Sequence, residues 1–259
     1  MARYLDVQLN LWLAVEGVAR RPLGLATGRT MEPLYAALVQ RLKQWPDPDL
    51  QRLRSIWCSF NLDEYLGLPA HDPGSYRSYM RHHLGDPLQL PSTALQLPEC
   101  SADADAEHSA DRYAEALQRH GGIGLQLLGL GSNGHVGFNE PPAEADCKCH
   151  AVTLSAATRL QNAAMFGGDP SAVPNRAITL GLAEILGSEE IHLVVTGASK
   201  AEILHRLLAL RRPEPSLPAS WLLNHPNVWL WADAAALALT AENAHHEHRS
   251  SEARLGAEL

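Results

Sequence analysis

Segments with helical periodicity alternate with short apolar runs along almost the whole chain. In the first segment, Leu5, Leu9, Trp12 and Leu13 fall on one face of a helix expected over residues 4–19. Apolar runs bounded by turn-forming residues predict strands over 22–26, 55–62, 123–130, 150–154, 190–197 and 227–233. Further helices are expected over about 33–44, 75–83, 104–121, 155–166 and 199–210, with another beginning near Ala234.

Several predicted strands are continuous apolar runs, which is typical of strands covered on both faces. Alternating strands and helices predict a single α/β domain, an open and mostly parallel sheet with helices on both faces (Rossmann-like, doubly wound). No repeat or low-complexity linker divides the chain, so we expect this domain over residues 1–244 and a polar tail over 245–259. Prolines place 46–50 and 90–99 in loops.

Composition narrows the class of protein. Hydrophobic residues make up 46% of the 259 and charged residues 19%, which favours a packed core over disorder. No apolar run approaches the ~20 residues that a membrane span requires, and the N-terminus lacks a signal-peptide core, so a cytoplasmic protein is expected. The net charge is −8 without a cluster of Lys and Arg, which argues against a nucleic-acid partner but allows a small anionic ligand.

Three residue types receive ordinary structural interpretations. The spacing of Cys147, Cys149 and His150 is too short for a structural zinc site, so no metal is expected and the thiols are expected in a surface loop. Most of the six tryptophans fall in predicted strands or helices, which favours core packing. The histidines outside the candidate site are expected at the surface, including His82, His83, His245 and His246.

Four predicted strands end in small or acidic segments, and ligands bind beyond the carboxyl ends of strands in open α/β sheets. The segments are "TGRT" (27–30), "DEY" (63–65), "GSNGHVGFNE" (131–140) and "GASK" (197–200). The first and last lead into helices, whose N-terminal backbone N–H groups attract anions. One alternative is that Thr30 and Ser199 are only helix N-caps. The cations in both loops favour a phosphate site made by Thr27, Gly28, Arg29, Thr30, Ser199 and Lys200.

The other two segments carry acid–base groups. Asp63 and Glu64 directly follow a strand, and only one is expected to face the site, where it can act as a proton-transfer base. The alternative is a solvated acidic turn. His135 and Glu140 supply a second acid–base group and a possible orienting partner. The loop that contains Gly131, Gly134 and Gly137 has few bulky side chains, so we expect a ligand to lie against its backbone.

These motifs resemble those of the glucosamine-6-phosphate deaminase/isomerase family, which shares its fold with the 6-phosphogluconolactonases. The resemblance covers about residues 23–233. Its most specific segments are "FNLDEYLGLPAHDPGSYRSYM" and "LLGLGSNGHVGFNEP", supported by "LGLATGRT" and "VVTGASKAEIL". Lactonases typically carry an arginine after the strand-end acids and lack "FNEP".

The resemblance implies an enzyme without a metal or organic cofactor. It would interconvert an amino-sugar 6-phosphate with a ketose 6-phosphate and ammonia. By resemblance, Asp63 takes the position of the base that moves a proton between C2 and C1. His135 takes that of the ring-opening acid–base group, and Glu140 that of its partner. The family's phosphate pocket is matched by Thr27, Gly28, Thr30 and Lys200.

One departure from the family concerns the ring-opening group. Asn133 stands where the deaminases usually carry aspartate. A neutral amide can orient a histidine but cannot stabilise an imidazolium through charge. Asparagine here is similar to the galactosamine-6-phosphate isomerase branch, which makes the C4 epimer a second substrate candidate.

Other departures concern phosphate binding, regulation and assembly. Ala164 occupies the place of a phosphate-binding arginine, and we expect Arg29 to restore that charge from the opposite loop. The basic pair that serves activator binding in regulated members is replaced by His150 and Val152, so activation by an N-acetylated sugar phosphate is not expected. The chain lacks most of the family's leading β-strand, which puts the family's oligomer interface in doubt, so a homo-oligomer is one possibility among the assembly states.

Two alternative functions differ in class from the deaminase. Lactone hydrolysis on the same fold would be favoured by an arginine after Asp63 and Glu64, but Tyr65 follows them. A non-catalytic sugar-phosphate sensor would accommodate Asn133. Sensors of this kind carry a helix-turn-helix module, and only about 20 residues precede the first predicted strand. The retained acid–base groups favour catalysis.

Overall fold

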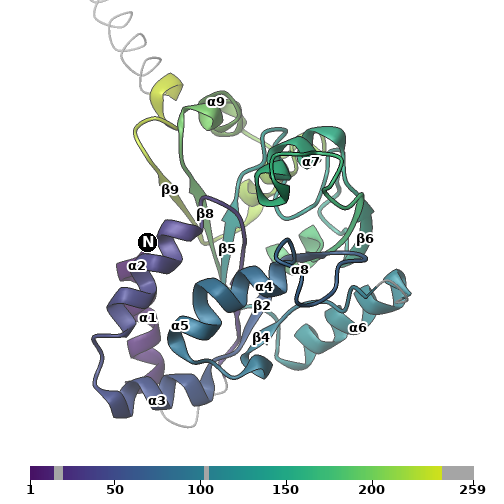
Figure 1. Cartoon of the computed structure of the whole chain (residues 1–259). Coiled ribbons are helices and arrows are strands. Elements are labelled where there is room, and N and C mark those ends of the chain that lie inside the picture. Colours follow the sequence, from purple (N-terminus) through teal and green to yellow (C-terminus); the bar gives the residue numbers. More distant parts are fainter. Residues whose placement is uncertain (15–19, 102–104, 241–259) are drawn as a thin grey trace, which may run out of the picture.

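Six short strands form one parallel sheet through the centre of the molecule (Figure 1). The computed structural model describes residues 1–14, 20–101 and 105–240. All neighbouring strands in this sheet run parallel, with Leu23 opposite both Ser59 and Leu125, for example. In spatial order the strands are β4 (Leu95–Gln96), β2 (Ser59–Asn61), β1 (Leu23–Leu25), β5 (Leu125–Gly129), β8 (Glu190–Val195) and β9 (Val228–Ala232).

The strand order fixes where a ligand site can form. From β1 the chain adds β2 and β4 on one side, and then β5, β8 and β9 on the other. The order therefore reverses between β1 and β5, and the loops after these strands diverge at their carboxyl ends. Such a switch point leaves a crevice in open α/β sheets. The predicted parallel, doubly wound sheet is confirmed.

A smaller antiparallel sheet lies beside the first, in the order β3-β7-β6. Its strands are β3 (Asp63–Tyr65), β7 (Arg176–Thr179) and β6 (His150–Thr153). Only Leu62 separates β2 from β3, and its backbone bonds both Leu25 and Leu180. Leu62 therefore links the two sheets, and the acidic pair that follows lies in a strand rather than a turn.

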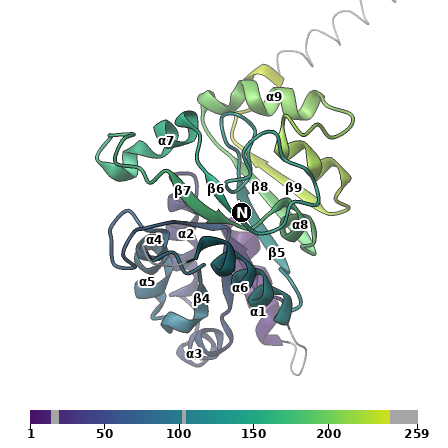
Figure 2. The same ribbon diagram turned by 90° about the vertical axis from the view of Figure 1, so that its right-hand side faces the viewer.

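Helices cover both faces of the parallel sheet (Figures 1 and 2). The helix α1 (Ala2–Ala14) buries Leu5, Leu9 and Leu13, as its periodicity predicts. One large apolar cluster fills the interior, and a second cluster, which includes Phe60, Tyr113 and Ile178, lies in part under α6. No described helix has the length and apolar character to cross a bilayer. The other α-helices are α2 (Glu32–Leu42), α3 (Asp47–Ile56), α4 (Tyr76–Met80), α5 (Asp86–Leu88), α6 (Ala106–Arg119), α7 (Ala156–Asn162), α8 (Leu182–Leu186) and α9 (Ala201–Ala209).

Several predicted boundaries were wrong. Residues 46–50 form the start of α3 rather than a loop, because Pro46 and Pro48 lie at its first turn, where a helix needs no N–H donor. The strand predicted over 55–62 is shortened to β2, since α3 extends to Ile56. The loop predicted over 90–99 contains the edge strand β4. The predicted end of the first helix, at residues 15–19, lies outside the described residues.

Two elements were missed, and some burial expectations were wrong. The prediction left β7 and α8 unassigned between residues 167 and 189. Residues 234–237 form turns and helical residues begin at Ala238, four residues later than predicted; the tail beyond 240, with His245 and His246, lies outside the described residues. His192 is fully buried rather than at the surface, whereas Trp229 is 49% exposed rather than in the core. Cys149 is buried, unlike the half-buried Cys147.

Candidate active site

A cavity of about 150 Å³ lies at the switch point of the parallel sheet. It is lined by the loops after β1 and β5, by β3, and by residues of α7 and of the turn before α9. These segments are far apart in the sequence, and the strand order brings them to one edge. Of the predicted site residues, the structure places the following in the lining: Thr27, Gly28, Arg29, Thr30, Asp63, Gly131, His135, Gly137 and Lys200.

A larger cavity of about 680 Å³ lies elsewhere and contains Glu64 instead of Asp63. Successive side chains of a strand point to opposite faces, so β3 separates the two cavities. The prediction that only one of the two acids faces the site is therefore supported. We identify the smaller cavity as the candidate site because it alone combines Asp63 with His135 and Lys200.

Asp63 is a buried carboxyl group with an unusually high proton affinity. Its side chain is 5% exposed, and burial together with the negative charge of Glu64 raises the pKa of Asp63 well above its ordinary value. A raised pKa makes the ionised carboxylate a stronger base. Gly137, with a φ of 58°, passes close by: a Cβ there would lie 3.6 Å from Asp63 Oδ2.

Glu64 has a structural position on the other side of β3. Its carboxylate accepts hydrogen bonds from the backbone N–H groups of Tyr65, Tyr76 and Arg77, at 2.8–2.9 Å. These bonds attach the start of α4 to β3. Because Tyr76 also lines the smaller cavity, Glu64 helps to hold one wall of the candidate site.

His135 is oriented by a relay of hydrogen bonds. Its Nδ1 lies 2.7 Å from Asn133 Oδ1, and Asn133 Nδ2 donates to Glu140 Oε2 at 2.8 Å. An ionised carboxylate only accepts, so the amide must turn its Nδ2 to Glu140 and its Oδ1 to His135. His135 must then carry its proton on Nδ1 and leave the lone pair of Nε2 free. Asn133 and Glu140 thus act through His135 rather than lining the cavity themselves.

The charges of this relay differ from those of a histidine paired directly with an acid. Burial, and to a lesser degree Lys200, lowers the pKa of His135 to about 4 despite the opposing effect of Glu140. Burial alone would raise the pKa of Glu140, but hydrogen bonds from Thr158 and Asn133 and the nearby His135 bring it below its ordinary value. Near neutral pH the relay therefore holds a neutral imidazole and an ionised carboxylate.

The glycines of the loop serve packing as much as ligand access. A Cβ on Gly131 would lie 2.4 Å from atoms of the His135 ring, so this glycine makes room for the catalytic candidate. Gly134 does not line the cavity, and a Cβ there would meet Leu217 at 2.8 Å. The expectation that a ligand lies against Gly134 was therefore wrong, and the small residue is explained by core contacts.

The loops after β1 and β8 meet at one end of the cavity. Thr196 Oγ1 lies 3.5 Å from Thr30 Oγ1, across a sequence separation of 166 residues. Gly28 and Gly197 adopt φ values of 96° and 91°, which disfavour a side chain. Burial, with a further contribution from the charge of Arg29, lowers the pKa of Lys200. Two neighbouring cations in a partly buried site suit an anionic ligand such as a phosphate.

The alternative that Thr30 and Ser199 serve as N-caps is wrong. The cap positions belong to Met31 for α2 and Lys200 for α9, and neither is capped by a side chain. Thr30 lines the cavity, but Ser199 is exposed and does not. Ser199 is therefore removed from the set of residues that the structure brings together.

Residues of α7 complete the site and were missed by the sequence prediction. Gln161 Oε1 accepts from Lys200 Nζ and from the backbone N–H of Ser132, both at 3.1 Å. Asn162 lines the cavity and donates to the hydroxyl of Tyr65 at 3.0 Å. The only sequence signal was the N-cap Ser155, which fixes where α7 begins and accepts from Thr158 N–H. A helix start does not reveal which of its side chains reach a distant lysine.

The described residues offer no group of three His, Cys, Asp or Glu side chains placed to hold a metal ion. Cys147 Sγ lies 3.5 Å from His150 Nδ1, yet Cys149 points into the second apolar cluster. The short Cys-x-Cys-His segment therefore gives no metal site within the described part of the chain.

Comparison with known proteins identifies a matching family and similar relatives. Residues 2–231 match the family described as glucosamine-6-phosphate isomerases/6-phosphogluconolactonase. A glucosamine-6-phosphate deaminase of Rhodopirellula baltica is 42% identical over 234 residues, which covers 89% of this chain and 90% of that protein. One from Shouchella clausii is 41% identical over 223 residues, covering 86% and 87%.

Solved structures agree with these sequence relatives. A monomeric glucosamine-6-phosphate deaminase has a TM-score of 0.76 at 32% identity, covering 90% of this chain and 94% of that one. A 6-phosphogluconolactonase from Trypanosoma cruzi has a TM-score of 0.67 at 21% identity, covering 91% and 90%, and shows the fold alone. The chain belongs to the family of glucosamine-6-phosphate isomerases and 6-phosphogluconolactonases, as its motifs predicted.

Proposed function

We propose that this chain is an amino-sugar-6-phosphate deaminase/isomerase that converts glucosamine-6-phosphate to a ketose 6-phosphate and ammonia. The observation that carries the proposal is one cavity containing Asp63 and His135, with Lys200 and Arg29 where two loops meet. The first pair supplies acid–base chemistry, and the second suits the phosphate. No metal or organic cofactor enters the proposed reaction.

Asp63 is the proposed base of the isomerisation. In the open-chain sugar, its carboxylate removes the proton from C2 and returns it to C1, while the C1 carbonyl oxygen gains a proton and the C2 ammonium loses one, which converts the amino aldose to a ketose iminium. Water then adds to C2, and ammonia leaves. Burial supports this role, because a desolvated carboxylate is a stronger base than one in water.

His135 is the proposed group for ring opening. Its free Nε2 accepts the proton of the anomeric hydroxyl and passes it to the ring oxygen. The low pKa of His135 keeps this nitrogen unprotonated in the free enzyme above about pH 4. Asn133 and Glu140 are positioning residues in this proposal, since they hold the ring and its tautomer through hydrogen bonds.

No observation of similar weight supports lactone hydrolysis or a non-catalytic sensor. Lactonases typically carry an arginine after the strand-end acids, whereas Tyr65 is buried here and its hydroxyl bonds Tyr76 and Asn162. A non-catalytic sensor has no use for a buried base with a raised pKa beside a histidine with a fixed tautomer. The C4 epimer stays a second substrate candidate, favoured only by Asn133.

The test is to supply glucosamine-6-phosphate, galactosamine-6-phosphate and 6-phosphogluconolactone separately to the purified protein. We expect ammonia and ketose phosphate from one or both amino sugars, and no acid release from the lactone. Hydrolysis of the lactone alone would overturn the assignment, and inactivity on all three would favour a sensor. The ratio of kcat/KM for the two amino sugars would identify the preferred C4 configuration.

Asp63→Asn is the matched control for mechanism. The amide keeps the size and shape of the side chain but cannot accept the C2 proton. We expect exchange of that proton with solvent to stop, while binding of inorganic phosphate persists. Continued exchange would identify another base.

A further inference from the structure

One side-chain oxygen in the candidate site accepts hydrogen bonds from two different loops. Gln161, on α7, bonds Lys200 Nζ in the turn before α9 through its Oε1. The same Oε1 accepts from the backbone N–H of Ser132, in the loop after β5, and both distances are 3.1 Å. Gln161 and Lys200 both line the cavity. A single amide therefore joins a cation of the predicted phosphate pocket to the loop that carries His135.

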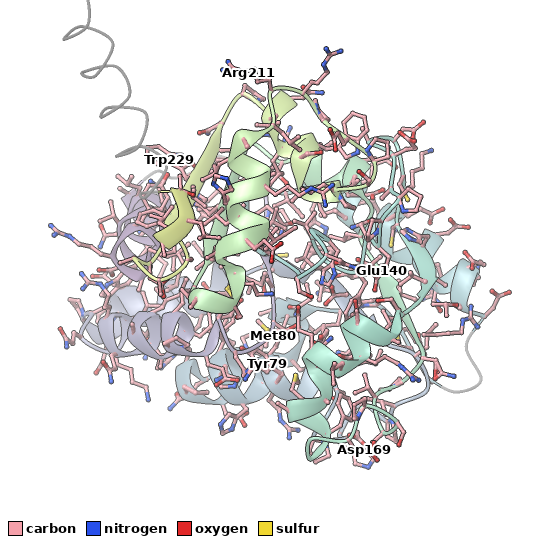
Figure 3. All side chains as sticks on the ribbon, turned by 90° about the horizontal axis from the view of Figure 1, so that it is seen from above. Tyr79, Met80, Glu140, Asp169, Arg211 and Trp229 are labelled. Carbon is pink, nitrogen blue, oxygen red and sulfur yellow. The ribbon has the colours of Figure 1, made fainter. Side chains whose placement is uncertain are left out.

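The helix α7 also holds the other end of that loop. Thr158 lies one helical turn before Gln161 and so shares its face of the helix. The Thr158 hydroxyl donates to Glu140 Oε1, which also accepts from the N–H of the N-cap Ser155. Glu140 lies next to α7 (Figure 3) and is the last member of the relay to His135. The loop is thus fixed by α7 at both its beginning and its end.

The partner of Lys200 is a neutral amide rather than an acid. Within the described part of the chain, no ion pair joins Lys200 to a carboxylate, and Arg29, which acts on it, has the same sign of charge. An amide oxygen accepts a hydrogen bond without cancelling the charge of the donor. Of the three N–H donors of the ammonium group, Gln161 uses one, and the other two have no acceptor among the described residues. The full positive charge and two donors are therefore left for an anion.

We propose that Gln161 is a positioning residue of the phosphate site, whose amide oxygen directs Lys200 to the 6-phosphate of the substrate without neutralising its charge. A carboxylate at position 161 would also hold Lys200, but it would compete with the phosphate for the ammonium group. An apolar side chain would leave the charge but lose its direction. The proposal rests on the proposed function only in taking the anion to be a sugar phosphate. Gln161 acts through Lys200 and the loop, not on the reacting atoms.

The first test compares side chains of similar size at position 161 by their affinity for inorganic phosphate, measured by calorimetric titration. Gln161→Glu keeps an acceptor for Lys200 and Ser132 but adds a negative charge. We expect the dissociation constant to rise by about tenfold or more, because a charge-assisted bond to the phosphate is weakened. Gln161→Met removes the acceptor and leaves the charge of Lys200, so we expect a smaller rise of about threefold.

The matched control is Gln118→Glu on α6, an exposed glutamine that does not line the cavity. It adds the same charge elsewhere and should leave the dissociation constant unchanged. Unchanged circular dichroism of all variants would show that they fold. The order of the two Gln161 variants separates positioning from a structural role. If Gln161 only attached α7 to the loop, glutamate would keep both bonds and methionine would be the more harmful change.

The charge of Lys200 can be followed directly, because the chain has only three lysines, Lys43, Lys148 and Lys200. In an NMR titration of the lysine side chains, the Lys200 signal is assigned by its loss in Lys200→Met. Gln161→Glu should raise the pKa of Lys200, because a neighbouring carboxylate stabilises the ammonium ion.

Neither measurement requires turnover of a sugar. A protein that shows the expected order of phosphate affinities but releases no ammonia would therefore contradict the proposed function alone. Four results would overturn the role of Gln161: no binding of phosphate to the wild-type protein, equal affinity in the wild type and Gln161→Glu, a greater loss in Gln161→Met than in Gln161→Glu, or an unchanged pKa of Lys200 in Gln161→Glu.

Discussion

At the residue scale, Asn133 replaces a charged orienting group with a neutral one. Its amide still fixes His135, because Glu140 accepts from Nδ2 and thereby turns Oδ1 to the ring. What changes is the charge beside the imidazole. A neutral partner does not offset the effect of burial, which lowers the pKa of His135 to about 4.

Asn133→Asp should raise the pKa of His135, because a carboxylate 2.7 Å from Nδ1 stabilises the imidazolium. In the wild-type protein the ring is neutral above about pH 4, so its Nε2 can accept a proton through the neutral range. In the variant this neutral form is lost at a higher pH, and the acid limb of kcat/KM attributable to His135 moves upward. Ring-resolved NMR titration of His135 is the direct measurement, because ionisation of Asp63 also affects the rate.

Asn133→Ala separates orientation from charge. The alanine removes the hydrogen bond without adding a carboxylate, so we expect little upward shift of the pKa. We expect kcat to fall by about 10–100-fold, as is common when an orienting partner is lost. An unchanged pKa in Asn133→Asp would show that the amide does not face the ring as the relay requires.

At the element scale, β3 gives two neighbouring acids different tasks. Asp63 faces the candidate site, while Glu64 accepts three backbone N–H groups on the opposite face. Glu64→Ala should lower the free energy of unfolding by about 1–3 kcal/mol, the cost of leaving a buried donor unsatisfied. Urea unfolding measures this change. Glu99→Ala, an exposed acid on the same large cavity, should change stability by no more than about 0.5 kcal/mol.

Sequence reasoning located the strands that end at the site better than the elements around them. The apolar runs of β1, β5 and β8 are bounded by turn-forming residues, so their carboxyl ends were found to within two residues. By contrast, β7 has four residues and pairs only with antiparallel neighbours, and the start of α3 contains two prolines. Short strands and proline-bearing helix starts carry no periodic signal, so tertiary contacts decide them.

At the candidate site, residues at strand ends were predicted well, whereas residues whose placement depends on side-chain direction were not. Strand-end positions identified Asp63, His135 and Lys200, because topology alone brings them together. Side-chain direction is not readable from a loop sequence, so Ser199 was wrongly included and Gln161 was missed. Those two depend on how α7 and the turn before α9 pack.

At the scale of the whole molecule, the strand order brings the loops after β1 and β8 together over the end of β5. Arg29 and Lys200 belong to these loops and line the same cavity as Ala164, where the deaminases usually have an arginine. If Arg29 supplies the missing charge, Arg29→Ala should raise KM for the sugar 6-phosphate by about 10–100-fold. The unphosphorylated amino sugar should lose little, since it makes no such contact. Steady-state kinetics with both sugars is the measurement.

Arg211 offers a control, because Figure 3 shows it at the rim of the molecule, and Arg211→Ala should leave both KM values unchanged. The double variant Arg29→Ala with Ala164→Arg tests the reasoning more sharply. Both positions face one cavity, so a guanidinium returned from α7 and its following turn should recover much of the lost affinity for the phosphate. Equal losses for the phosphorylated and unphosphorylated sugars would mean that Arg29 acts on the fold of its loop. In that case Lys200 and the loop N–H groups would bind the phosphate without a second cation.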